Sequence, residues 1–229
     1  MRVEKYNLLG GISPARSRSA VAVVVVDPQN DFCHVDGVVF KRAEKPQRIL
    51  DATKWIHSML TVARRHGVPC FITQSFFDDK YKLPALIKRH RRLGYRQKVC
   101  NESTWGARIE AIDIRPSDFI ITKHTADAFL YTCLEPLLWK CGVERLLLCG
   151  FLTEICVLET GRSAIQRGFE VIVPREGTAG LSGTCSDVAL NELAALQATI
   201  LSGQALLGDW LGHDIDRQLP LPLFAEIVL

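Results

Sequence analysis

The chain has 229 residues, 48% of them hydrophobic, and its 28 basic and 25 acidic side chains give a net charge of +3. This length is sufficient to bury the core of one α/β domain, so we expect a single domain over 1–229, with a core at about 20–203 and a tail over 204–229. The charge is too small to indicate a nucleic-acid partner, and we expect none.

One basic cluster lies in the middle of the chain and is interpreted as a solvated segment. An anion-binding role, towards a substrate entering the site, is the alternative. The cluster consists of Lys88, Arg89, Arg91, Arg92, Arg96 and Lys98.

Location and redox state follow from the N-terminus and the cysteines. Residues 1–18 carry charges from the second position and no uninterrupted apolar stretch, so we expect no signal peptide. The longest apolar run, Val21–Val26, is too short to cross a bilayer, so we expect no membrane association. The eight cysteines show neither CxxC pairs nor metal-ligand spacing, which indicates reduced thiols in a cytoplasmic protein. They are Cys33, Cys70, Cys100, Cys133, Cys141, Cys149, Cys156 and Cys185.

Short β-rich runs alternate with longer helical patterns in the first half of the chain. Val21–Val26 is a continuous, mostly β-branched run that predicts a strand buried on both faces. Apolar residues recur at helical spacing over 46–66, where Gly67 ends the helix, and Val68–Thr73 is the next predicted strand. A polar excursion over 74–115 has only weak helical patterning. Excursions of this length in α/β domains often carry a lid or a binding loop.

The second half continues the alternation. The predicted strands are Phe119–Thr122, Glu144–Cys149 and Phe169–Pro174, and the predicted helices are Cys133–Cys141, Ile155–Arg167 and Ser186–Leu201. This order predicts parallel strands joined by right-handed crossovers, and therefore an α/β protein built as a three-layer α/β/α sandwich. No GxGxxG or Walker-type loop follows a strand, which disfavours a nucleotide-binding domain.

Three reactive side chains lie at the ends of different predicted strands. Asp27 follows the first strand, Lys123 follows the third, and Cys156 lies on the first turn of the helix after the fourth. Each has an ordinary structural explanation: a turn-forming aspartate, an exposed strand-end lysine and a core thiol. Because ligand sites of open parallel sheets lie beyond the carboxyl ends of the strands, the three together predict an active site.

Each of these side chains has a chemical role in such a site. A helix N-terminus offers free N–H groups and a positive partial charge, so we expect a lowered pKa for the Cys156 thiol and stabilisation of an oxyanion. A partly desolvated Lys123 ammonium also favours the thiolate. The Asp27 carboxylate accepts the thiol proton and later activates water.

Three segments resemble motifs of the isochorismatase-like cysteine hydrolases. Residues 26–32, VDPQNDF, resemble the VDxQNDF start of that family. Residues 123–129, KHTADAF, resemble its K-x-x-x-x-A-F segment, and residues 150–157, GFLTEICV, resemble its G-x-x-T-x-x-C-V turn. The motifs occur in the family order and at family-like spacing over about 21–201.

The resemblance implies a mainly parallel six-stranded sheet, a catalytic triad of Asp27, Lys123 and Cys156, and a homodimer or homotetramer. It also implies an oxyanion hole from the N–H groups of Thr153 and Cys156, next to a cis peptide bond between Leu152 and Thr153. The side chains expected to wall the substrate pocket, any aromatic of which could equally be core, are Phe32, Trp105, Phe129 and Leu152.

Departures from related families narrow the function. Nicotinamidases carry a metal-binding Asp-x-His and a further His after the second strand, whereas residues 73–80, TQSFFDDK, contain no His, so we expect no metal and no other cofactor. True isochorismatases hydrolyse a vinyl ether and lack the cysteine. Residues 100–106, CNESTWG, loosely resemble a segment of ureidoacrylate and N-carbamoyl amidohydrolases.

The sequence therefore predicts a hydrolase that cleaves a C–N bond of a small amide, ureide or N-carbamoyl substrate. A catalytically idle binding or scaffold protein and a nicotinamidase-like amidase are the alternatives.

Overall fold

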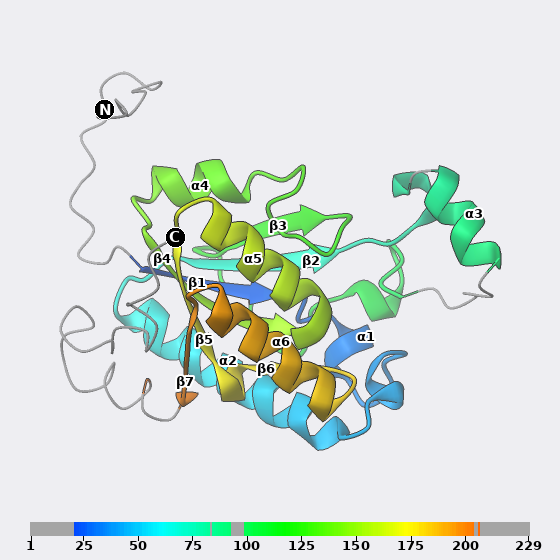
Figure 1. Cartoon of the computed structure of the whole chain (residues 1–229), viewed down its shortest axis with the longest axis horizontal. Helices are drawn as coiled ribbons and strands as arrows, with labels where there is room; N and C mark the ends of the chain where they lie inside the picture. Colours follow the sequence, from blue (N-terminus) through cyan, green and yellow to red (C-terminus); the bar gives the residue numbers. More distant parts are fainter. Residues whose placement is uncertain (1–20, 83, 93–98, 204–205, 207–229) are drawn as a thin grey trace.

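The computed structural model describes residues 21–82, 84–92, 99–203 and 206, and a parallel sheet forms its centre (Figure 1). Six strands lie in the order β3-β2-β1-β4-β5-β7, and a short β6 pairs beside β4. Every pairing is parallel. The strands are β1 (Val21–Val26), β2 (Cys70–Ser75), β3 (Phe119–Lys123), β4 (Arg145–Phe151), β5 (Glu170–Pro174), β6 (Thr178–Ala179) and β7 (Thr199–Leu201).

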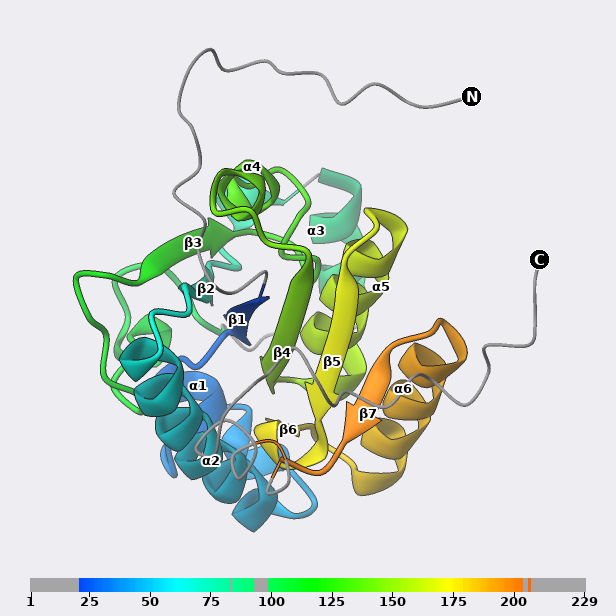
Figure 2. The same ribbon diagram turned by 90° about the vertical axis from the view of Figure 1, so that its left-hand side faces the viewer.

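Helices cover both faces of this sheet, which confirms the predicted three-layer sandwich (Figure 2). Helices α1 and α2 pack on one face, and α4, α5 and α6 pack on the other. The helices are α1 (Asn30–Cys33), α2 (Pro46–Arg65), α3 (Pro84–Arg92), α4 (Leu134–Lys140), α5 (Leu158–Gln166) and α6 (Gly183–Ala195).

Strand β1 explains why the core divides into two clusters. All six of its residues are buried. Val21, Val23 and Val25 pack beneath α2, whereas the alternate residues of the strand join the cluster beneath α4, α5 and α6. Successive side chains of a strand point to opposite faces, so a strand covered on both sides needs a continuous apolar run.

The prediction for the last helix is wrong in its second half. Helix α6 ends at Ala195 instead of continuing to 201, and Gln197 has a positive φ of 75°. Residues Thr199–Leu201 form β7, which pairs with β5. The residues there are apolar or β-branched, which suits a strand, and the edge of β5 supplies their hydrogen-bond partners. Helical periodicity in the sequence does not reveal such a distant partner.

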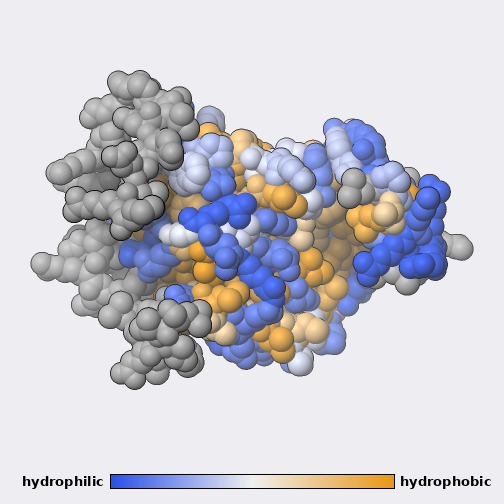
Figure 3. Space-filling model, turned by 45° about the horizontal axis from the view of Figure 1, so that its top comes forward, coloured by the Kyte–Doolittle hydropathy of each residue, from blue (hydrophilic) through white to orange (hydrophobic). Residues whose placement is uncertain are grey.

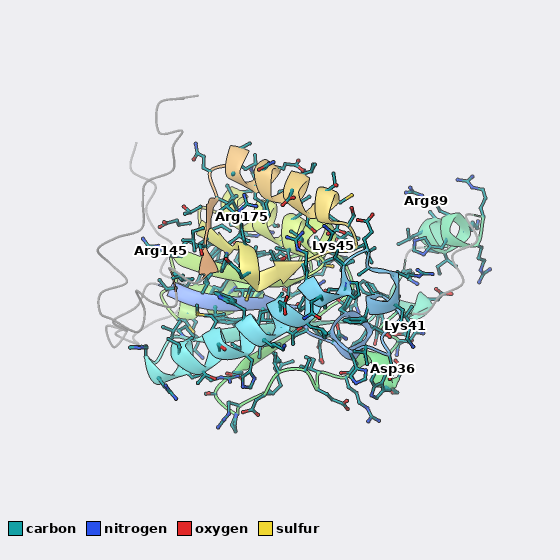
Figure 4. All side chains as sticks on the ribbon, turned by 90° about the horizontal axis from the view of Figure 1, so that it is seen from below. Asp36, Lys41, Lys45, Arg89, Arg145 and Arg175 are labelled. Carbon is teal, nitrogen blue, oxygen red and sulfur yellow. The ribbon has the colours of Figure 1, made fainter. Side chains whose placement is uncertain are left out.

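Helix α3, within the excursion over 74–115, projects away from the sheet and is hydrophilic on its surface (Figures 1 and 3). None of its residues is buried. Its basic residues Lys88, Arg89, Arg91 and Arg92 are exposed and form no ion pair with described residues. Arg89 is labelled in Figure 4. The remaining members of the predicted cluster, Arg96 and Lys98, lie outside the described residues, as does the predicted tail except Leu206.

Among the described residues, no helix is both long and apolar enough to cross a membrane.

Candidate active site

Asp27 and Lys123 meet at the carboxyl edge of the sheet although β2 separates their strands. The Lys123 Nζ lies 2.8 Å from the Asp27 Oδ2, and both side chains are fully buried. The ammonium also donates to the carbonyl oxygens of Thr125 at 2.9 Å and Ala126 at 3.3 Å. The lysine is therefore held by three oxygen atoms, one of them charged.

Two hydroxyl groups of β2 hold the Asp27 carboxylate. Thr73 Oγ1 donates to Oδ1 at 2.6 Å and accepts the Asp27 backbone N–H at 3.0 Å. Ser75 Oγ donates to Oδ2 at 2.8 Å. Our sequence reasoning did not identify Thr73 or Ser75. A signal was present, because two polar residues spaced by two on a buried strand share one face of the sheet.

Cys156 completes the cluster from a turn that follows β4. Residues Thr153–Val157, which we call the Cys156 turn, form a π-helical turn that leads into α5. The N–H groups of Ile155 and Val157 both donate to the Leu152 carbonyl at 3.1 Å. Cys156 is 4% exposed, and its thiol lies close enough to Asp27 and Lys123 for both charges to shift its pKa. The structure thus brings together the three residues predicted to form the triad.

The charge state of the thiol differs from the prediction. Burial and, to a smaller extent, the Asp27 charge raise the pKa of the Cys156 thiol to about 12, although the Lys123 charge lowers it. The expected lowering is wrong for the resting site, because desolvation of the thiolate outweighs the nearby cation. Burial also lowers the pKa of the Lys123 ammonium, but the Asp27 charge and the thiol outweigh it, and the net pKa is raised.

Close backbone contact between β1 and β4 sets the position of the Cys156 turn. Gly150 has φ of +120°, and a Cβ atom there would lie 2.1 Å from the Val26 carbonyl oxygen. Thr178 Oγ1 donates to the Gly150 carbonyl at 3.0 Å and lies 2.8 Å from Thr153 Oγ1. Only glycine permits this approach, which places the strand ends bearing Asp27 and Cys156 side by side.

The cis peptide bond lies between Phe151 and Leu152, so the predicted bond between Leu152 and Thr153 is wrong by one residue. Strand β4 runs to Phe151, and Leu152 alone joins it to the Cys156 turn. The strand extends two residues beyond its predicted end at Cys149, so the cis bond directly follows the strand. The oxyanion hole predicted at the N–H groups of Thr153 and Cys156 remains a prediction.

The four predicted pocket residues do not form a single cluster. Phe32 and Leu152 are buried in the core beneath α2, while Phe129 lies in the core on the opposite face, with its ring centroid 5.9 Å from that of Phe169. Trp105 is 38% exposed. Of the four, it alone has a substantial surface for contact with a ligand.

Within the described part of the chain, no group of three or more His, Cys, Asp or Glu side chains is arranged to hold a metal ion.

The fold and the site define an α/β protein with a buried carboxylate, ammonium and thiol at the carboxyl edge of a parallel sheet. The chain belongs to the isochorismatase family, because the family model described as Isochorismatase domain matches residues 21–205.

The individual relatives share about a quarter to two fifths of their aligned residues with this chain. Ureidoacrylate amidohydrolase RutB from Methylorubrum extorquens is 25% identical over 172 residues, which are 69% of this chain and 69% of RutB. Nicotinamidase 3 from Arabidopsis thaliana is 26% identical over 200 residues, 84% of this chain and 89% of that protein. For two curated relatives with higher identity, 31% and 39%, the chain spans only 50% and 25% of their length.

Among solved structures, a cysteine hydrolase from Pseudomonas syringae pv. phaseolicola 1448A has the same fold. The TM-score is 0.71 at 20% sequence identity, and the match covers 86% of this chain and 94% of that chain.

Proposed function

We propose that this protein is a cysteine-dependent amidohydrolase that cleaves the C–N bond of a small amide, ureide or N-carbamoyl compound. The observation that carries the proposal is the buried Lys123–Asp27 ion pair beside the buried Cys156 thiol, whose pKa both charges shift. Family membership supports it, as do the names of relatives that are amidohydrolases and nicotinamidases.

The resting state of the thiol explains why the site needs a base. With a pKa of about 12, Cys156 is a neutral thiol near pH 7 and a poor nucleophile. Asp27 lies next to the thiol and can accept its proton as the sulfur attacks. Lys123 stays positively charged throughout, because the pKa of its ammonium is raised. The positive charge offsets the negative charge that moves between the carboxylate and the sulfur.

The reaction then proceeds in two halves. The Cys156 sulfur attacks the carbonyl carbon, and the N–H groups of Thr153 and Cys156 stabilise the resulting oxyanion. The C–N bond breaks, and the amine leaves with the proton from Asp27. Water next attacks the thioester-like intermediate, gives a proton to Asp27, and releases the acid. That proton returns to the sulfur.

The buried position of the nucleophile favours a small substrate. Cys156 is 4% exposed and Asp27 and Lys123 are fully buried, so a folded polypeptide cannot place its backbone at the sulfur. The proposal also includes a cytoplasmic location and a homodimer or homotetramer. Size-exclusion chromatography with light scattering measures the mass of the oligomer.

The test is ammonia release from a panel of ureidoacrylate, N-carbamoyl amino acids, nicotinamide and aliphatic amides. We expect release from at least one compound by the wild type and none by Cys156→Ala. Acid quenching during turnover should leave the acyl mass on the peptide that contains Cys156. The absence of ammonia release, together with no acyl mass on the peptide that contains Cys156, would favour an idle binding protein instead.

Chelation separates this proposal from a metal-dependent nicotinamidase-like amidase. Prolonged treatment with a chelator should leave turnover unchanged. Loss of turnover that Zn²⁺ or Fe²⁺ restores would support the metal-dependent alternative.

A further inference from the structure

Residues that follow Asp27 hold a segment about 75 residues away, 100–108, which we call the Trp105 segment. Gln29 Nε2 donates to the Ala107 carbonyl at 2.9 Å. Asn30 Nδ2 donates to the Trp105 carbonyl at 3.0 Å. Both Gln29 and Asn30 are fully buried, so these bonds are shielded from water and resist opening.

Asp31 contributes a carboxylate to the hydrogen bonds that hold the Trp105 segment. Its Oδ2 accepts the Cys100 N–H at 2.6 Å, and its Oδ1 accepts the Val38 N–H at 3.3 Å. Cys100 has a positive φ of 48°, which is uncommon for a residue other than glycine. The buried carboxylate therefore stabilises a turn that would otherwise relax.

Gly106 shows how closely the Trp105 segment packs on this carboxylate. A Cβ atom at Gly106 would lie 2.3 Å from the Asp31 Cγ. The carboxylate cannot move aside without losing its bonds to Cys100 and Val38. The segment and Asp31 thus fit together only in this arrangement.

The Trp105 segment is connected to the triad through Phe77. Phe77 donates its N–H to the Cys100 carbonyl at 3.4 Å, and its ring centroid lies 6.0 Å from the Lys123 Nζ. A shift of the turn at Cys100 would therefore reach the residue that lies over the catalytic lysine.

Gln29 provides a second connection, because its amide bonds to both the N–H and the carbonyl of Ser75, at 2.8 and 3.0 Å. Ser75 in turn holds Asp27.

We propose that Asp31 is a positioning residue that fixes the Trp105 segment as one wall of the substrate site and thereby sets which substrates fit. This inference rests on the proposed function of the site. Asp31 is not assigned a proton transfer, because both its oxygen atoms are engaged by backbone N–H groups. Its loss should therefore change substrate fit while the thiol chemistry stays intact.

The first test is Asp31→Asn, which leaves one acceptor oxygen for two backbone N–H groups. For a substrate identified by ammonia release, KM should rise about tenfold while kcat stays within about twofold, because the wall and not the chemistry is changed. The pH profile of Cys156 alkylation by iodoacetamide should not shift. Asp36→Asn is the matched control, since Asp36 is an exposed carboxylate in the turn that follows α1 and is paired with Lys41 at 3.3 Å (Figure 4).

Two measurements do not depend on turnover. Amide hydrogen exchange of peptides covering 99–108 should become faster in Asp31→Asn, while peptides of β1 and β4 stay unchanged. N-phenylmaleimide is bulkier than iodoacetamide, so a looser wall should favour it. The ratio of its modification rate at Cys156 to that of iodoacetamide should therefore increase several-fold in Asp31→Asn. If no substrate is found, these measurements still test Asp31, so failure of the proposed function and failure of this inference are distinguishable.

A second variant covers the case in which Asp31→Asn does not fold. Gly106→Ala should reproduce the faster exchange over 99–108. The double variant Asp31→Ala/Gly106→Ala lacks the carboxylate with which the new methyl group clashes. Its increase in hydrogen exchange over 99–108 should therefore be smaller than the sum of the increases in the two single variants. Unchanged exchange and KM in both single variants would overturn the inference. A shifted alkylation profile with lowered kcat would also overturn it, because Asp31 would then take part in the chemistry.

Discussion

The Lys123 Nζ and the Asp27 Oδ2 are 2.8 Å apart in a region where neither side chain has any exposed surface. Removing two charges from water is unfavourable, and a buried pair is tolerated only when further hydrogen bonds satisfy it. Here Thr73 and Ser75 donate to the carboxylate. This arrangement holds a carboxylate and an ammonium side by side near Cys156.

Replacing the sulfur tests the covalent mechanism. Cys156→Ala and Cys156→Ser should each reduce turnover by at least about a thousandfold, because neither side chain forms a thioester under these conditions. The circular dichroism spectrum and the urea midpoint should remain close to those of the wild type. If Cys156→Ala turned over substrate within tenfold of the wild type, another nucleophile would have to be sought.

The two charged residues should move the thiol pKa in opposite directions. Lys123→Met removes the nearby cation and should raise the pKa of Cys156 further, whereas Asp27→Asn removes the nearby anion and should lower it. Both variants should turn over slowly, Asp27→Asn because no group carries the proton. The rate of iodoacetamide alkylation at Cys156, compared with that of the wild type at one pH near neutrality, reports the direction of both shifts, because the thiolate fraction sets that rate. A lower pKa in Lys123→Met, or near-normal turnover in Asp27→Asn, would contradict the assigned roles.

Stability should fall at alkaline pH because several thiols are buried. Burial raises the pKa of Cys33, Cys100 and Cys149 above the ordinary value of 9.0, and raises the pKa of Cys70 to about 12. Below about pH 9 these thiols are neutral in both the folded and the unfolded protein. Above it they ionise only in the unfolded chain, so each lowers the free energy of unfolding by about 1.4 kcal/mol per pH unit.

Urea midpoints measured between pH 7.5 and about 10 check this dependence. In Cys149→Ala the urea midpoint should fall less steeply with pH, because one buried thiol is missing. Replacement of the exposed Cys133 should leave the pH dependence of the midpoint unchanged. Midpoints that stay flat up to pH 10 would show that the buried thiols are not protected from ionisation.

Gly150→Ala tests the close approach of β1 and β4. A methyl group there would lie 2.1 Å from the Val26 carbonyl oxygen, so the strand ends must separate. We expect a loss of at least about 2–3 kcal/mol in the free energy of unfolding. Turnover should fall further than stability alone explains, because Asp27 and the Cys156 turn move apart.

Gly142→Ala is the control for this prediction, since Gly142 also has a positive φ, +68°, but a Cβ atom there meets nothing within 4 Å. Its effect should be limited to about 1 kcal/mol of backbone strain and should leave turnover intact. Equal losses of turnover in the two variants would mean that strain, and not the strand approach, is responsible.

The sequence by itself determined the parallel sandwich and the edge at which Asp27, Lys123 and Cys156 lie. Apolar runs of strand length and helical periodicities are local signals, and the carboxyl ends of parallel strands meet at one edge. The three reactive residues could therefore be placed together without knowing any contact between them.

Only the tertiary structure decided the contacts and charge states that depend on distant parts of the chain. Thr73 holds Asp27 across 46 residues, and Asp31 holds Cys100 across 69. The raised pKa of Cys156 depends mainly on burial in the folded core, which outweighs the lysine visible in the sequence. Such effects arise from desolvation and from long-range hydrogen bonds, and neither has a sequence period.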